Sequence, residues 1–361
     1  VGGPLQLRRY RGGVPCSAEG LPREGTKGYR LLDSQNQKAR IQRRAACSIK
    51  QVALPNKQNQ KKMKTRTAKL RDIEQVGFPI VKAAFKGKDG NVYVGAMMVD
   101  SGSVHCILNK SVLSLIDESS VIDGKTMDIH SVQGKGVKCQ GVSFNFKIGC
   151  GEYTDTFYVN NTIDFNAMFD GVLIGIIGHE FLRKNKLVLD YNKEELRHSD
   201  GKLDEDMNDY EFFFPMEFGL KKYNLPIVGI AHNDKEYILV ADSGANSTIM
   251  TKNVVDDAGI CKEVLSTEGD VTCFTNETMD TNFCHVSLDL VSVGGTPESP
   301  KLYKSEDIVQ AISDYEYLMD GLKDPEGNEV PPICGLLSSV FMHRNKWVLD
   351  FGVGVIYKAA A

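Results

Sequence analysis

An internal repeat constrains this chain more than any other feature of its sequence. An Asp-Ser-Gly loop begins at Asp100 and another at Asp242, 142 residues later, and each follows an apolar, β-like run. Residues 175–191 are likewise matched by residues 335–351, in which two apolar residues precede a small residue and the segment ends in Val-Leu-Asp plus an aromatic residue. Because both pairs recur in the same order, the sequence predicts two equivalent units.

Short apolar stretches separated by turns predict strands in both units. Residues 79–85 and 92–99 flank a turn that contains Asp89-Gly90, a pair typical of β-hairpins. Residues 137–148 alternate apolar and polar side chains, as a strand with one buried face does. The pattern favours a mainly β fold of two small barrels with about six strands each.

The second unit contains an insertion, which we expect to form an added helix. Residues 305–318 place Ile308, Ile312 and Tyr315 at helical spacing after a Ser-Glu-Asp start. The domain organisation that we expect is a disordered basic tail (1–72), an N-terminal lobe (73–198), an acidic linker (199–210) and a C-terminal lobe (211–361).

The expected tail is strongly basic. Residues 1–70 hold 17 Lys or Arg and three acidic residues, and they show little hydrophobic periodicity, so they cannot build a core. Three interpretations stay open. In the first, residues 1–62 are not native, since residue 1 is valine and Met63 could be a start. In the second, the tail binds nucleic acid or another acidic partner, and in the third it is an acid-poor targeting peptide.

Composition also bears on location and partners. No apolar run is long enough for a membrane span, and no secretory pattern begins the chain. The nine cysteines show no CxxC spacing, which favours reduced thiols and a cytoplasmic protein. Arg183 stands where a HExxH motif beginning at His179 would need histidine, so we expect no metal site.

The repeated residues carry a family resemblance. An Asp-Ser-Gly loop, a flap-like hairpin region, two apolar residues with Gly, a short helix and a Val-Leu-Asp strand resemble the retropepsin-like aspartic proteases of retroviruses and retrotransposons. The resemblance covers residues 77–194 and 225–358, so the chain is similar to a fused, single-chain version of a protease that is usually a homodimer. It implies a monomeric endopeptidase that acts on polypeptides without a cofactor or metal.

The resemblance also implies a site. Asp100 and Asp242 would be the catalytic pair, with roles exchangeable by pseudo-symmetry, because two close carboxyl groups can share one proton. The residues expected to support them are Ser101, Gly102, Ser103, Ser243 and Gly244 in the loops, and Ile176, Ile177, Gly178, Leu336, Leu337 and Ser338 beneath them. The serines at 101 and 243 are expected to join the loops, and the Ser103 hydroxyl to lower the pKa of Asp100. Gln133 and Gly134 mark a flap candidate.

Two features of the sequence count against an active protease. Ser338 stands where the first unit has Gly178, a position that the family keeps small for close packing, and the flap candidate has no aromatic residue at its tip. The alternative is therefore a catalytically inactive module that binds peptides or proteins in the same cleft. Asp190 and Asp350, which also recur in the second repeat, are expected at turns or on the surface and receive no catalytic role.

Overall fold

The computed structural model describes residues 67–71, 73, 77–130, 136–160, 173–203, 209–222, 224–232, 235–266, 270–272, 278–295, 300–312 and 333–361. The described part of the chain is mainly β, with two closed six-stranded barrels. The expectation of two β-barrel lobes is thereby confirmed. Among the described residues, no helix has the length and apolar character needed to cross a bilayer.

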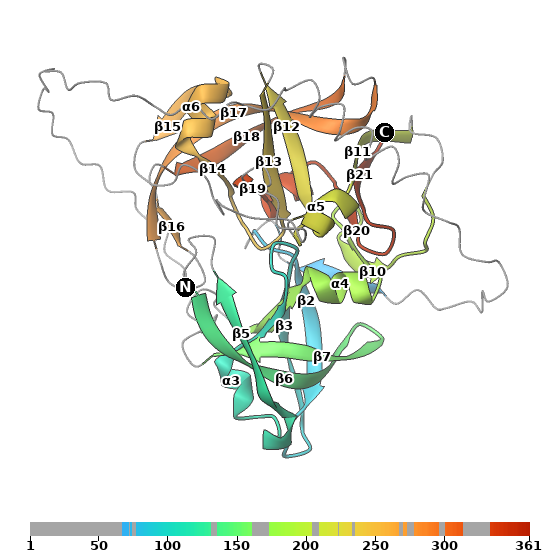
Figure 1. Ribbon diagram of the computed structural model, residues 1–361. Helices are drawn as coiled ribbons and strands as arrows, with labels where there is room; N and C mark the ends of the chain where they lie inside the picture. Colours follow the sequence, from blue (N-terminus) through green and yellow to red (C-terminus); the bar gives the residue numbers. More distant parts are fainter. Residues whose placement is uncertain are drawn as a thin grey trace, which may run out of the picture. The chain divides into compact units, whose positions relative to one another are not determined.

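Most strands of the N-terminal barrel are labelled in Figure 1. The barrel is closed by pairing between the first and the last strand of the order given next. In barrel order its strands are β2 (Ile80–Lys86), β3 (Val92–Asp100), β8 (Leu173–Gly178), β4 (Cys106–Leu108), β7 (Gly151–Val159) and β6 (Gly136–Ile148). A further strand, β5 (Val121–His130), pairs with β6. The β2–β3 hairpin and its Asp89-Gly90 turn agree with the sequence prediction, and Gly90 has the positive φ of 84° that favours glycine.

The C-terminal barrel repeats this order strand for strand. Its members are β12 (Ile227–His232), β13 (Lys235–Asp242), β19 (Ile333–Ser338), β14 (Thr248–Thr251), β18 (Pro300–Ile312) and β17 (Thr278–Gly295). Pairing of β12 with β17 closes it, and β15 (Cys261–Ser266) and β16 (Asp270–Thr272) add to β17. The duplication predicted from the sequence therefore extends to the strand order of both barrels.

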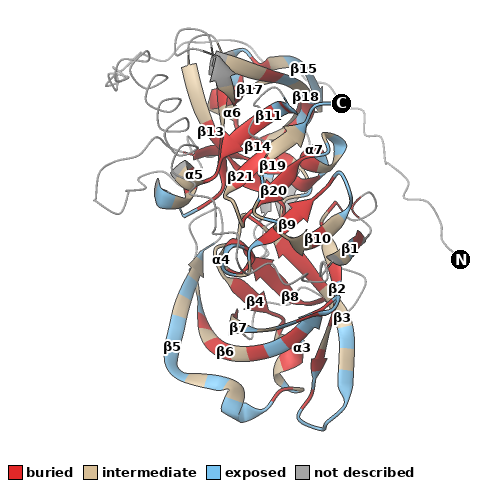
Figure 2. Ribbon diagram, turned by 90° about the vertical axis from the view of Figure 1, so that its right-hand side faces the viewer, coloured by how far each residue is buried: buried red, intermediate tan, exposed pale blue. Residues whose placement is uncertain are grey.

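A third sheet is shared between the two units. Its order is β11 (Tyr210–Pro215), β21 (Val355–Ala359), β20 (Val348–Asp350), β9 (Leu187–Asp190), β10 (Glu195–His198) and β1 (Thr67–Arg71). The repeat strands β9 and β20 pair antiparallel at its centre, with Leu189 opposite Leu349. Both strands, and β19, are coloured as buried along their length in Figure 2.

The helices are short and lie at strand ends. They are α3 (Lys110–Leu113), the 3-10 turn η2 (Glu118–Ser120), α4 (His179–Lys184), α5 (Glu217–Lys222), α6 (Lys252–Ala258) and α7 (Ser339–Arg344). The two that belong to the repeat, α4 and α7, directly follow β8 and β19. The aromatic core includes Phe212 stacked on Trp347, with ring centroids 4.5 Å apart.

Two sequence expectations about secondary structure need correction. Residues 305–312, expected in an added helix, lie in β18, which pairs along its length with β17 and in parallel with β14. Residues 67–71, expected in the disordered tail, form β1, where Leu70 is buried. The rest of the expected tail, residues 313–318 of the expected helix and the acidic stretch 204–208 lie outside the described residues.

The aspartates of the two Val-Leu-Asp strands, Asp190 and Asp350, lie at turns as expected, and both are buried. Asp190 accepts a hydrogen bond from the Lys193 backbone N–H and pairs with Arg197 at 3.2 Å. Asp350 accepts from the Gly352 backbone N–H at 2.8 Å and from the Ser199 hydroxyl at 2.9 Å. A strand-end carboxylate can be buried here because the shared sheet supplies donors for it.

Candidate functional site

The two Asp-Ser-Gly loops occupy equivalent places in the two barrels. Asp100 ends β3 and lies opposite Gly178 of the parallel neighbour β8, while Asp242 ends β13 and lies opposite Ser338 of β19. Each loop therefore leaves the barrel where two parallel strands end together, and a short helix follows the second of those strands. This placement brings the two loops against one another.

The loops are joined by reciprocal hydrogen bonds between their serines. The Ser101 backbone N–H donates to Ser243 Oγ at 2.7 Å, and the Ser243 N–H donates to Ser101 Oγ at 2.8 Å. Each hydroxyl in turn donates to a carbonyl of the other unit, Ser101 to Ala241 O at 2.6 Å and Ser243 to Val99 O at 2.7 Å. Both serines are fully buried, so these bonds are made without competition from water.

The two aspartates meet at the centre of this arrangement. Their carboxyl groups hydrogen-bond to one another. An ideal Cβ placed on Gly102 would overlap the Asp242 carboxyl group, and one placed on Gly244 would overlap that of Asp100. Glycine is thus required at both positions by close approach, because each loop backbone lies against the carboxyl group of the other unit.

Burial dominates the electrostatics of the pair. It raises the pKa of both carboxyl groups, and the negative charge of Asp242 raises the pKa of Asp100 further, well above its ordinary range. Backbone N–H groups act in the opposite direction, among them Gly244 N–H, which donates to Asp242 Oδ1 at 2.8 Å. Two carboxyl groups so placed favour a state in which one is ionised and the other keeps a proton.

The role expected for the Ser103 hydroxyl is wrong. The Ser103 backbone N–H donates to Asp100 Oδ1 at 2.9 Å, but the hydroxyl donates to His105 O at 2.8 Å. The side chain therefore satisfies a carbonyl of its own loop and does not reach Asp100. The basis for expecting a lower pKa on Asp100 is absent.

No known protein family matches this chain, and no curated protein does.

Beneath the loops the expected apolar residues are buried. Ile176, Ile177, Leu336 and Leu337 lie in β8 and β19, which are buried throughout. Gly178 is tightly enclosed, since an ideal Cβ there would lie 2.5 Å from His105 O and 2.8 Å from Ser103 O. The second unit has Ser338 at this position, and its surroundings differ.

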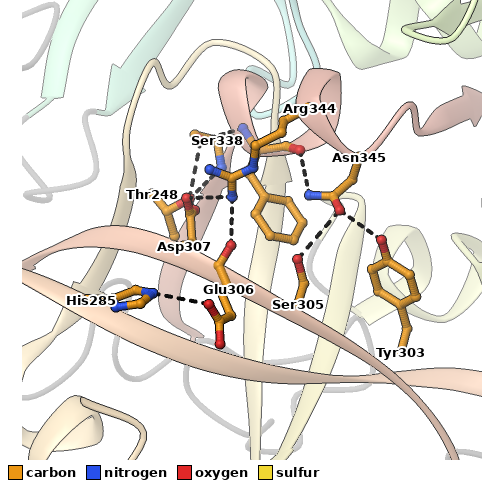
Figure 3. Close-up of polar contacts among 10 residues, drawn as sticks. Thr248, His285, Tyr303, Ser305, Glu306, Asp307, Ser338, Arg344 and Asn345 are labelled. Atoms are coloured by element: carbon orange, nitrogen blue, oxygen red, sulfur yellow. Dashed lines mark hydrogen bonds and ion pairs between the residues drawn. The ribbon is translucent and has the colours of Figure 1, made fainter. Parts of the chain in front are cut away.

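Ser338 belongs to a buried polar cluster of the C-terminal unit (Figure 3). Its hydroxyl caps α7 by accepting from the Phe341 backbone N–H at 3.1 Å. The Thr248 hydroxyl lies 3.2 Å from Ser338 Oγ and 2.5 Å from Asp307, which also pairs with Arg344 at 3.0 Å. Position 248 is cysteine in the first unit, Cys106. The additional hydroxyl at 338 is therefore matched by a second one at 248, and Ser338 packs beneath its loop without disturbing it.

A pair of hydroxyl groups below the two carboxyl groups of Asp100 and Asp242, which we call the dyad, was not predicted from the sequence. Tyr191, which follows β9, and Ser339, the first residue of α7, are both buried and lie 2.9 Å apart between Oη and Oγ. In the sequence Tyr191 is only the aromatic residue that ends the repeat. The sequence does contain a sign of this contact, because the two copies of the repeat differ here. The residues equivalent to Tyr191 and Ser339 are Phe351 and His179.

The flap candidate, Gln133 and Gly134, lies outside the described residues. The strands on either side of it, β5 and β6, pair antiparallel up to His130 and Gly136. An equivalent arrangement exists in the second unit, where β15 and β16 pair with β17. Among the described residues, no three His, Cys, Asp or Glu side chains are grouped to hold a metal ion.

Proposed function

We propose that this chain is a single-chain aspartic endopeptidase of the retropepsin-like kind. The observation that carries the proposal is the carboxyl pair, in which Asp100 and Asp242 hydrogen-bond at the junction of two duplicated barrels. The reciprocal serine bonds and the two enclosed glycines hold that pair in a fixed geometry. Pre-arranged groups of this kind lose little free energy to reorganisation during a reaction.

The chemistry follows from the shared proton, as it does in aspartic proteases generally. The ionised carboxylate takes a proton from a water molecule, which attacks the peptide carbonyl carbon, while the protonated carboxyl group donates a hydrogen bond to the carbonyl oxygen. The resulting tetrahedral intermediate collapses when the leaving nitrogen receives a proton from the dyad. The C–N bond then breaks, and an acid and an amine are released.

The dyad must hold one proton, which sets the expected pH dependence. Activity falls at low pH when both carboxyl groups are protonated, and at high pH when both are ionised. Because burial raises the pKa of both groups, we expect a bell-shaped profile with its maximum in the acidic range.

Cleavage of a random peptide library by the full chain at mildly acidic pH tests the proposal. We expect wild type to cleave, and Asp100→Asn and Asp242→Asn each to lose activity by about a thousandfold or more, as removal of a principal catalytic group does. Asp289→Asn, in β17 opposite Lys304 of β18, is the matched control and should keep full activity.

Activity that survives in either dyad variant would refute the mechanism. A wild-type chain that retains library peptides without cutting them would favour the inactive binding module instead. The full chain is the appropriate sample because β1, within the segment expected to be disordered, is part of the shared sheet.

A further inference from the structure

The hydroxyl pair below the dyad joins the two units. Tyr191 belongs to the first unit, but its backbone N–H donates to Trp347 O of the second at 3.0 Å. Its phenol contacts the hydroxyl of Ser339, whose own backbone N–H donates to Ala245 O in the loop of Asp242 at 2.8 Å. Tyr191 thus extends from one unit to the underside of the other unit's loop.

The directions of these hydroxyl groups follow from a count of donors. Ser243 has one O–H, and it is used on Val99 O, so toward Tyr191 this oxygen can act only as an acceptor. Tyr191 also hydrogen-bonds with Ser243, and the phenol is therefore the donor in that contact. Ser339 must then donate to Tyr191. The phenol O–H then points at Ser243 in the loop of Asp242, and the Ser339 O–H points at the phenol oxygen.

The pKa of the Tyr191 phenol is affected by the charges of the dyad. Burial raises the pKa of Tyr191, and the negative charges of Asp242 and then of Asp100 raise it further. The phenol therefore stays protonated and can serve as a fixed donor in a site of low dielectric, where such dipoles act strongly.

The equivalent corner on the other side has no such donor. Phe351 occupies the position of Tyr191, and its N–H donates to Leu187 O at 3.0 Å, the counterpart of the Trp347 bond. His179 occupies the position of Ser339. This fully buried histidine has the side chain of Asn224 beside its ring. Ser101 therefore lacks the phenol donor that Ser243 has.

Backbone donors do not distinguish the two carboxyl groups, since the Gly244 N–H donates to Asp242 Oδ1 at 2.8 Å and the Ser103 N–H to Asp100 Oδ1 at 2.9 Å. On the basis of the unequal hydroxyl groups we propose that Asp242 is the ionised base of the pair and Asp100 the proton donor, with Tyr191 and Ser339 as the positioning residues that fix this choice. The assignment of roles rests on the proposed function; the hydroxyl arrangement does not.

The test compares Tyr191→Phe and Ser339→Ala with wild type over a range of pH. Each variant removes one O–H group and should lower kcat roughly fivefold, the factor equivalent to about 1 kcal/mol for one neutral hydrogen bond. The acidic limb of the kcat/KM profile, which reports the ionised carboxyl group, should move to higher pH by about half a unit. The double variant should lower kcat little more than either single variant does, because the Ser339 hydroxyl acts through the phenol oxygen of Tyr191.

Tyr303→Phe is the matched control. Tyr303 is also buried and also donates its hydroxyl, to Asn345 Oδ1 at 2.7 Å, but in the C-terminal barrel away from the dyad. Removal of the Tyr303 hydroxyl should lower the stability of the fold without moving the pH profile of kcat/KM. A profile of Tyr191→Phe that superimposes on wild type, or that moves no more than that of Tyr303→Phe, would overturn the proposal.

A second readout does not depend on cleavage. Carboxyl-carbon NMR titration of chain labelled at aspartate should show the first dyad ionisation displaced upward in Tyr191→Phe and Ser339→Ala, and unchanged in Tyr303→Phe. If the displacement is seen but wild type cuts no peptide, the hydroxyl arrangement stands and the proposed function fails. If wild type cuts and no displacement is seen, the proposed function stands and the positioning role fails.

Discussion

The carboxyl pair should make the stability of the fold depend on pH. Burial and the charge of Asp242 raise the folded-state pKa of Asp100 above its unfolded value. The stabilising contribution of the protonated group is then complete below the unfolded pKa of about 3.9 and is lost as pH rises through the folded pKa, at about 1.4 kcal/mol for each unit of difference. Asp100→Asn removes this loss, since asparagine does not ionise.

We therefore expect Asp100→Asn to unfold at the same temperature as wild type near pH 3 and at a higher temperature near pH 7. Thermal unfolding followed by circular dichroism measures both. Asp289→Asn is the control for loss of a carboxyl group outside the pair. If the unfolding temperatures of Asp100→Asn and wild type differ by the same amount at every pH, the carboxyl pair is not the source of the pH dependence.

Gly178→Ser and Ser338→Gly should differ in how much free energy of unfolding they remove. Gly178→Ser places a Cβ 2.5 Å from His105 O, so we expect a loss of about 1–3 kcal/mol in the free energy of unfolding. Ser338→Gly removes the cap of α7, and glycine in place of a capping serine costs only a few tenths of a kcal/mol in other proteins. Urea unfolding of both variants measures the difference, and equal losses would contradict the packing described here.

At this scale the sequence predicts what the two copies share and misses what depends on contacts between them. Asp100, Asp242 and the two glycines could be predicted because their spacing recurs. The contact of Tyr191 with Ser339 could not, because the two residues are 148 positions apart and come from different units. The Ser103 hydroxyl was misassigned because a nearby backbone carbonyl competes for it.

Among the elements, β1 shows how far the fold extends into the segment expected to be disordered. It pairs with β10 and β2, and it buries Leu70. A chain that begins at residue 73 should lose roughly 2 kcal/mol or more relative to one that begins at residue 67, from burial of this leucine alone. Urea unfolding measures the two midpoints. Identical midpoints would show that β1 contributes nothing to stability.

The strand β18 shows why a local pattern can mislead. Ile308 and Ile312 are four residues apart, as on a helix face, yet Ile308 is exposed while Asp307, Val309 and Ala311 point inward. Pairing with β17 and β14 imposes a two-residue period that the apolar residues only partly follow. The hairpin of β2 and β3 was predicted correctly because its turn residues are local.

In the molecule as a whole, the shared sheet connects the two barrels. Three of its strands come from each half, with β9 and β20 at the centre. Asp190 and Asp350 end these two strands and accept hydrogen bonds at the turns that follow them. The sheet and the serine bonds of the loops together hold the carboxyl groups of the two halves in contact.

The two corners below the dyad show what a fused chain gains. In an assembly of two identical subunits, every change on one side of the axis is copied on the other. Here one gene encodes both sides separately, so a phenol at 191 can stand opposite a plain benzyl ring at 351. A substitution in one half therefore need not be repeated in the other, and selection can act on the two corners independently.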